Sequence, residues 1–247
     1  WLLNQHFTFP RLTSGGITLE LISTKEIVDI LPYSEHAAVL VEKRPLPNSL
    51  QYKVSYTVIN FETKSPEVIT KSAYLLKKFG SSYKAISEAC PNFVQCDAAV
   101  LYDRRVLVVY PNGEAGIFDR EGELEWSGVF QYHDETIKHL ALEEKYFWSV
   151  CPNENAVIRY SCQNMKVDLR IGGKDADTFI SPQHICYDDG NLYVACGGNK
   201  IRKIDGFNYT VSDYRSFSQR VKRYHKFGKY TIVVLESGAY FVDEENE

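Results

Sequence analysis

The sequence predicts an all-β protein built from one repeated four-stranded unit. From residue 97 onward, apolar runs of four to seven residues, rich in β-branched side chains, alternate with turn-forming pairs. Each pair contains glycine, which supplies the positive φ that a tight hairpin turn requires. The pairs are Asn112-Gly113, Glu121-Gly122, Asp189-Gly190, Gly197-Gly198, Asp205-Gly206 and Ser237-Gly238.

These runs form strand-turn-strand segments that repeat along the chain. Equivalent positions at 106, 146, 191 and 231 recur every 40 or 45 residues. Each segment follows another short apolar run, and three of the four are followed by a fourth run. Periods of this length with four strands per unit are typical of β-propeller blades. We therefore predict a single β-propeller with five blades of four antiparallel strands, with six blades as the alternative.

The whole chain, 1–247, is predicted to form this one domain. The predicted blades cover 26–72, 97–130, 136–171, 182–217 and 220–243, the last with only three strands. An apolar run at 16–24 precedes the first blade, and we expect it to pair as the missing outer strand of the last one, since an open ring would expose sheet edges. Residues 73–96 do not fit the pattern; they predict either an inserted loop that contains a helix or two strands of a sixth blade.

One stretch carries a family resemblance. The segment SPQHICYDDGNLYVACGGNKIRKID, residues 181–205, is similar to blades of the NHL kind, whereas the Trp-Asp and Gly-His signatures of WD repeats do not occur. The resemblance to β-propeller repeat proteins covers 16–243 and rests on blade spacing and turn pattern. It implies a fold but not a function, because propellers serve as scaffolds, lectins, hydrolases and lactonases alike.

Composition narrows the possible partners. Charged residues make up 24% of the chain and no apolar run reaches the 18 to 20 residues of a membrane span, so we expect no membrane contact. The net charge of −4 makes nucleic acid an unlikely partner, and an intracellular location is slightly favoured. Six cysteines lack zinc-site spacing, so we predict reduced, buried thiols and no cofactor. A hairpin at Asp189-Gly190 would place Cys186 opposite Tyr193 and on the other face from Cys196.

Three histidines fall on predicted innermost strands of successive blades. His139, His184 and His225 are expected to line the channel, where imidazoles could bind metal or move protons. Counting from the following turns places them at different heights, and the face parity of His139 differs from that of the other two. This spacing favours scattered channel-lining side chains, and we assign no metal ligand. Asp29, Asp97 and Asp188 also lie on or beside innermost strands, as a glycosidase would need.

Another candidate is a basic segment interleaved with aromatic residues between 214 and 230. Its cations are predicted to bind a protein or peptide partner, with an acidic partner as one option, and the acidic tail at 243–247 is an alternative partner within the chain. They are Arg215, Arg220, Lys222, Arg223, Lys226 and Lys229.

Motifs for nucleotide binding, for a serine nucleophile on a sharp turn and for zinc peptidases are absent from the sequence, and no catalytic residue is assigned. The leading hypothesis is a non-enzymatic interaction scaffold. The first alternative is a hydrolase with a channel site, either a glycosidase or a metal-dependent lactonase-like enzyme, and the second is a carbohydrate-binding lectin.

Overall fold

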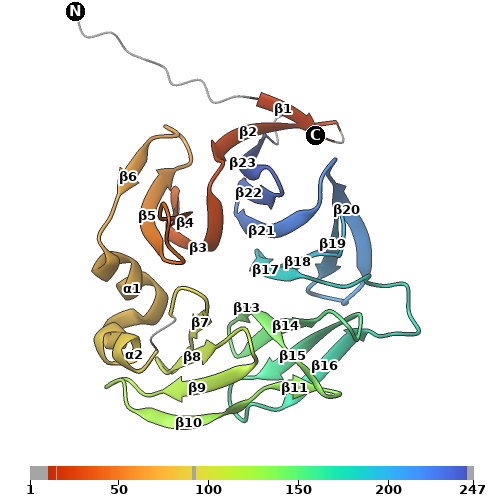
Figure 1. Ribbon diagram of the computed structural model, residues 1–247. Coiled ribbons are helices and arrows are strands. Elements are labelled where there is room, and N and C mark those ends of the chain that lie inside the picture. Colours follow the sequence, from red (N-terminus) through yellow and green to blue (C-terminus); the bar gives the residue numbers. More distant parts are fainter. Residues whose placement is uncertain (1–10, 15, 91–92, 244–247) are drawn as a thin grey trace, which may run out of the picture.

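The computed structural model describes residues 11–14, 16–90 and 93–243, and the chain forms a ring of five blades around a central channel (Figure 1). The prediction of five antiparallel four-stranded blades is confirmed. In each blade the first strand lies innermost and the later strands follow outward. The innermost strands are β3 (Glu26–Ser34), β7 (Asp97–Val100), β13 (Lys138–Glu143), β17 (His184–Asp188) and β21 (Val221–Phe227).

The outer strands follow in sequence order within each blade. The first blade adds β4 (Ala37–Pro45), β5 (Tyr52–Asn60) and β6 (Pro66–Val68). The second adds β8 (Val106–Val109), β9 (Glu114–Phe118) and β10 (Leu124–Val129). The third adds β14 (Tyr146–Cys151), β15 (Ala156–Ser161) and β16 (Val167–Gly172), and a small hairpin of β11 (Gln131–Tyr132) and β12 (Glu135–Thr136) precedes it. The fourth adds β18 (Asn191–Ala195), β19 (Lys200–Asp205) and β20 (Val211–Ser216).

The fifth blade closes the ring with strands from both ends of the described chain. β22 (Tyr230–Leu235) and β23 (Gly238–Asp243) follow β21, and β2 (Ile17–Ser23) pairs antiparallel with β23. This confirms the prediction that the N-terminal strand completes the last blade. A further strand, β1 (Arg11–Ser14), pairs with β2, so this sheet has five strands.

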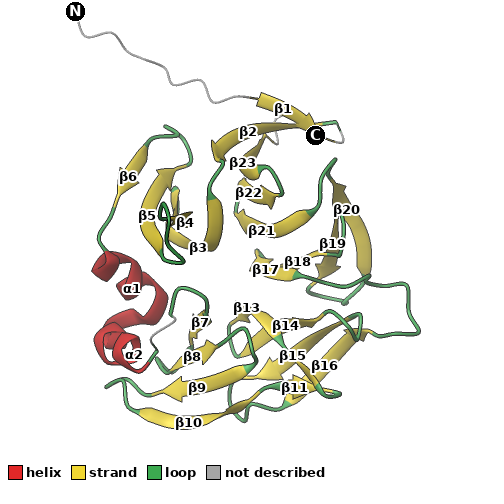
Figure 2. Cartoon of the chain, in the orientation of Figure 1, coloured by secondary structure: helices red, strands yellow, loops and turns green. Residues whose placement is uncertain are grey.

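A helical insertion separates the first and second blades (Figure 2). It comprises α1 (Lys71–Phe79), a 3₁₀ turn (Gly80–Ser82) and α2 (Tyr83–Ala89). Thr70 caps α1 by accepting a hydrogen bond from the Ala73 amide, and the buried face of α1 packs Tyr74 and Phe79 between the blades. The sequence alternative of two strands here is wrong. Neither helix in the described ranges is long and apolar enough to cross a membrane.

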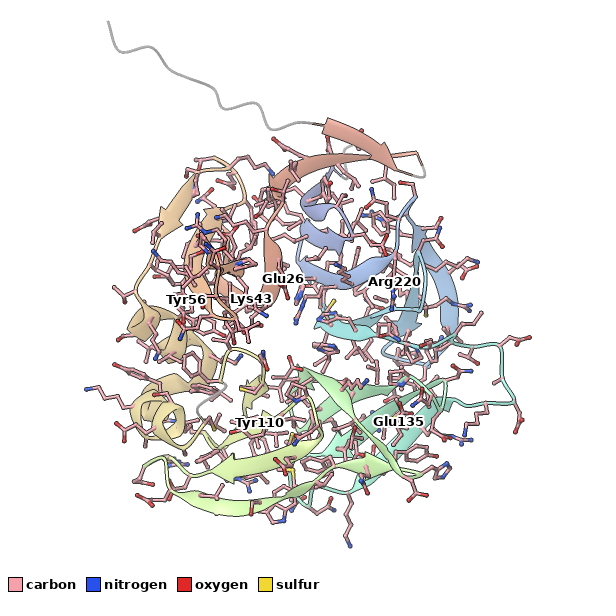
Figure 3. The ribbon with its side chains drawn as sticks, viewed as in Figure 1. Glu26, Lys43, Tyr56, Tyr110, Glu135 and Arg220 are labelled. Carbon is pink, nitrogen blue, oxygen red and sulfur yellow. The ribbon has the colours of Figure 1, made fainter. Side chains whose placement is uncertain are left out.

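Apolar clusters fill the spaces between neighbouring blades, and Figure 3 shows side chains packed throughout these spaces. Between the first and fifth blades, for example, Ile30 and Phe61 pack with Ile232 and Phe241, all at most 4% exposed. All six cysteines are free and lie in such buried positions, as predicted. Burial of this kind supplies the main favourable free energy of the fold.

The hairpin at Asp189-Gly190 has the predicted register. Cys186 pairs with Tyr193, and both turn residues have positive φ, 44° and 75°. Glycine in the turn at Asp205-Gly206 is needed for a different reason: a Cβ on Gly206 would lie 1.8 Å from the carbonyl oxygen of Gly190. The first and third turns of the fourth blade therefore approach each other closely, which no side chain at Gly206 would permit.

Candidate functional site

A cavity of about 700 Å³ occupies the central channel and is lined by residues of all five innermost strands. Its polar lining includes Asp29, Asp97, His184, Arg223 and His225, and apolar residues such as Leu31, Leu140 and Phe227 line the space between them and the exposed turns. It extends to the exposed turns that follow the innermost strands. Residues of those turns in the lining include Ser34, Glu35 and Gly228.

The three histidines singled out in the sequence lie next to one another. The ring centroids of His139 and His184 are 4.8 Å apart, and those of His184 and His225 are 4.5 Å apart. Three neighbouring blades therefore contribute to one row of imidazole rings. His184 and His225 line the cavity directly, and His184 is only 4% exposed.

The expectation that these histidines stand at different heights and on different faces is wrong. The pairing of β13 with β14 shifts register between Lys138 and Ala141, and His139 has a φ of 59°. A β-bulge of this kind re-aims side chains and cancels the simple alternation of faces. Positive φ is unfavourable for a non-glycine residue and is often found at functional sites.

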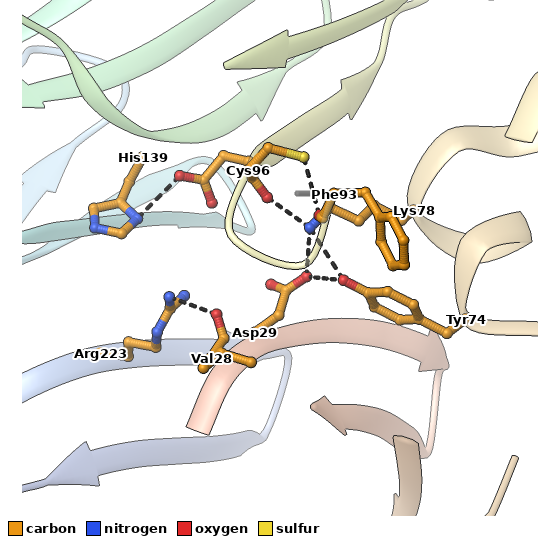
Figure 4. Close-up of polar contacts among 9 residues, drawn as sticks. Val28, Asp29, Tyr74, Lys78, Phe93, Cys96, His139 and Arg223 are labelled. Atoms are coloured by element: carbon orange, nitrogen blue, oxygen red, sulfur yellow. Dashed lines mark hydrogen bonds and ion pairs between the residues drawn. The ribbon is translucent and has the colours of Figure 1, made fainter. Parts of the chain in front are cut away.

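His139 also contacts a carboxylate on the neighbouring blade. Its Nδ1 atom lies 3.2 Å from Oδ2 of Asp97, the first residue of β7 (Figure 4). Burial opposes ionisation of Asp97, but the interaction with His139 holds the pKa of this carboxyl down to about 2.

The other two histidines are held neutral. Burial first, and then the neighbouring His225 and His139, lower the pKa of His184 well below its usual value. Burial and the charge of Arg223 lower the pKa of His225 to about 3. His184 hydrogen-bonds to the backbone of Tyr224, whereas its Nδ1 and the Nε2 of His225 are buried without a hydrogen-bond partner.

A buried ion pair closes the channel wall between the first and second blades (Figure 4). Lys78 of α1 donates to Oδ2 of Asp29 at 2.9 Å and to the carbonyl oxygen of Cys96 at 2.6 Å. The hydroxyl of Tyr74 donates to the same Asp29 oxygen at 2.6 Å. Burial opposes the charge on Lys78, but Asp29 raises its pKa, so the ammonium group remains protonated.

Sequence reasoning missed Tyr74 and Lys78 because residues 73–96 did not fit the blade pattern. One signal could have found them: a tyrosine and a lysine four residues apart share one face of a helix. Asp29 and Asp97 were noted as carboxylates of innermost strands. Only the structure showed that Asp29 is bound to a helical lysine and Asp97 to a histidine.

The six cations of the basic segment do not form one surface. Arg215 is 8% exposed with its guanidinium over the ring of Tyr214, and Arg223 and Lys226 line the cavity. The exposed members are Arg220, Lys222 and Lys229. The first two lie near the start of β21 and Lys229 follows its end, so a strand about 23 Å long separates them.

The site lacks the geometry of a metal centre in the part of the chain that the structure describes: no group of three or more His, Cys, Asp or Glu side chains is arranged to hold an ion. What the arrangement offers instead is hydrogen bonding to a bound molecule. Arg223 donates, His184 and His225 present unpartnered ring nitrogens, and Asp97 and His139 form a charge-stabilised pair.

No family model and no curated protein matches the chain. Solved structures do, among them virginiamycin B lyase from Staphylococcus aureus, with a TM-score of 0.53 and 10% identity over 97% of this chain and 95% of that one. A nidogen/laminin complex has a TM-score of 0.48 and 7% identity over 91% and 84% of the two chains. A luciferin-regenerating enzyme has a TM-score of 0.48 and 12% identity over 94% and 85%. Such low identities carry information on fold alone. The chain is therefore a β-propeller repeat protein with five blades, as its repeat spacing predicted.

Proposed function

We propose that the protein binds a small polar molecule in the cavity of its central channel. The observation that carries this proposal is the convergence of ionisable side chains from separate innermost strands on one cavity. Asp97, His184 and Arg223 with His225 come from three blades and line the same space of about 700 Å³. A concave site in which polar groups converge among apolar side chains is the usual form of a small-molecule site.

Unpartnered ring nitrogens support a ligand over a purely structural role. A buried polar atom without a hydrogen-bond partner costs about 1–3 kcal/mol, and folded proteins rarely keep several together. Nδ1 of His184 and Nε2 of His225 are two such atoms on adjacent rings. A molecule in the cavity that hydrogen-bonds to these nitrogens would recover part of that cost.

The test is a thermal-shift screen of the purified protein against a broad panel of small acids, amines, sugars and neutral polar compounds. A ligand of the folded state raises the midpoint of unfolding in proportion to its affinity and concentration. We expect at least one compound to raise the midpoint of the wild type and to lose its effect in Arg223→Gln. The matched control is Arg220→Gln, which alters an exposed arginine three residues away. A panel without any shift, or shifts equal in both variants, would contradict the proposal.

A partner-binding scaffold remains a second proposal. The observation that favours it is the exposure of three of the cations assigned to partner binding, Arg220, Lys222 and Lys229. We propose that Arg220 and Lys222, which lie close together near the start of β21, contact an acidic segment of a partner. Fluorescence anisotropy with a labelled poly-glutamate peptide tests this. Binding should weaken with salt and in Arg220→Glu/Lys222→Glu but not in Lys229→Glu, and equal binding by all three proteins would refute it.

A further inference from the structure

We propose that the ligand of the channel cavity is a carboxylic acid with a hydroxyl group on the neighbouring carbon and an apolar body. This inference rests on the proposed function and names the class of molecule that the cavity takes. It follows from three features of the lining: a cation without a carboxylate partner, a buried hydrogen-bond acceptor beside it, and apolar walls.

The cation is Arg223 on β21. One of its Nη atoms donates to the carbonyl oxygen of Val28 at 2.8 Å, which fixes the guanidinium across the gap between the fifth and first blades. Among the residues that the structure describes, no carboxylate forms an ion pair with it. A guanidinium has five N–H donors and binds carboxylates through two parallel hydrogen bonds. Arg223 can therefore receive the carboxylate of a ligand.

The remaining charges deep in the cavity already have partners. Asp29 is bound by Lys78 and Tyr74, and Asp97 is paired with His139. The other carboxylates of the lining, Glu35 and Asp188, lie at the far ends of β3 and β17. An ammonium group beside the ligand's carboxylate would therefore meet the positive charge of Arg223 without a carboxylate next to it. This arrangement favours an anion over a zwitterion.

The acceptor is Nδ1 of His184. The ring of His184 hydrogen-bonds to the backbone of Tyr224, and because its Nδ1 is buried without a hydrogen-bond partner, we assign that bond to Nε2–H. A neutral imidazole that donates through Nε2 has only an acceptor at Nδ1. The group that satisfies it must be a donor. A hydroxyl beside the ligand's carboxylate provides one while Arg223 holds the acid.

The apolar lining residues of the cavity indicate what the rest of the ligand is like. Apolar lining residues follow the polar ones along three innermost strands, namely Leu31 on β3, Ile185 on β17 and Phe227 on β21, and β13 adds Leu140 and Leu142. Ser34, Glu35 and Asp188 line the cavity beyond them, at the far ends of β3 and β17. The polar groups lie earlier on β7, β17 and β21. A ligand with both polar groups at one end and an apolar body at the other matches this order, and burial of its body adds about 25 cal/mol per Å².

Isothermal titration calorimetry with four matched compounds tests the proposal. The probes are 3-phenyllactate as separate enantiomers, 3-phenylpropionate without the hydroxyl, 3-phenylpropane-1,2-diol without the acid, and phenylalanine with an ammonium in place of the hydroxyl. Each is titrated into the wild type, Arg223→Gln, His184→Phe and the exposed control Arg220→Gln. A phenylalanine side chain at 184 keeps a buried ring but has no hydrogen-bond acceptor.

One enantiomer of phenyllactate is expected to bind the wild type tightest. Phenylpropionate should bind about 10-fold more weakly, because it leaves Nδ1 of His184 without a hydrogen-bond donor. The diol should bind about 10- to 100-fold more weakly, because it has no carboxylate for the Arg223 guanidinium. Phenylalanine should bind more weakly than phenyllactate. Arg223→Gln should lose about 10- to 100-fold in affinity for both acids but not for the diol. His184→Phe should bind phenyllactate and phenylpropionate equally well, because it has no acceptor for the hydroxyl. Arg220→Gln should behave as the wild type.

Preference of the wild type for phenylpropionate, the diol or phenylalanine would overturn this inference. So would a cavity ligand from the broad screen, sensitive to Arg223→Gln, when no member of the series binds; in that case the channel site would stand and its proposed ligand class would fall. If no compound of the series binds and no compound of the broad screen shifts the midpoint of unfolding, the proposed channel site itself is refuted. The comparison among compounds on the wild type decides the matter even if a variant does not fold.

Discussion

The Nδ1 atom of His139 lies 3.2 Å from Oδ2 of Asp97, so an ion pair joins the innermost strands of the second and third blades at the channel. Neither residue lies near the other in sequence, and His139 reaches its partner through a bulge in β13. Because the pair joins two neighbouring blades at the channel, its loss is expected to lower the stability of the ring.

Asp97→Asn should destabilise the protein by about 2 kcal/mol at pH 7. Although burial raises it, the net pKa of Asp97 falls from 3.8 to about 2 because of His139. A carboxyl whose pKa is lowered by folding contributes stability that is complete above pH 3.8 and is lost as the pH falls toward 2. Urea denaturation should therefore show that the wild type and Asp97→Asn differ less in their free energy of unfolding as the pH falls below 4. A difference that stays constant with pH would contradict the ion pair.

His225→Phe should make stability less dependent on pH between about 6 and 4. Burial and Arg223 lower the pKa of His225 from 6.5 to about 3. Between these two pH values His225 is therefore protonated in the unfolded chain but neutral in the folded chain. Each such proton costs about 1.4 kcal/mol per pH unit. Urea denaturation at several pH values should show that the free energy of unfolding of His225→Phe changes less steeply with pH than that of the wild type, by the equivalent of about one proton. His36→Phe, at an exposed histidine, should keep the wild-type slope, and equal slopes for all three would refute the prediction.

Lys78→Met should destabilise the protein by about 3–5 kcal/mol, because it leaves Asp29 buried without its counter-ion. The double variant Asp29→Asn/Lys78→Met should lose less than the sum of the two single variants, since neither charge then remains. Unfolding free energies from urea denaturation give this comparison. Lys77→Met, at the exposed neighbouring lysine, is the matched control. Additive losses would show that the two side chains do not interact.

Leu19→Ala should cost about 2–5 kcal/mol because it empties a position 1% exposed in the strand that closes the ring. Leu19 pairs with Val242 of β23, so the cavity would lie at the junction of the two ends of the described chain. Leu50→Ala, at a fully exposed leucine, should change the free energy of unfolding by less than about 0.5 kcal/mol. Similar values for the two variants would mean that closure by β2 contributes little to stability.

The sequence predicted the blades well because their signals are local. Turn pairs such as Asp189-Gly190 act within four residues, and alternation of side chains acts within a single strand. The pairing of β2 with β23 was also predictable, because the last blade lacked a strand and the run at 16–24 had no other place. The insertion was harder: α1 and α2 are short and break the repeat, so only the packing of Tyr74 and Phe79 between two blades shows why they are helical.

The site could be predicted only in part. Its histidines were visible as residues of innermost strands, but strict alternation separated His139 from the others, and a bulge overrode that rule. The basic segment shows the converse. Six cations close together in sequence were expected to act on one partner, yet the strand distributes them between the cavity, a blade interface and opposite ends of β21.

The sequence by itself thus determined the repeat and the closure of the ring, because these depend on interactions between neighbouring residues and on strands that need a partner. Only the tertiary structure decided between five and six blades, through the helices of the insertion, and showed which ionisable groups meet. Asp97, His184 and Arg223 line one cavity because ring closure brings strands from different blades together, and their protonation states follow from burial and from neighbours that are remote in sequence.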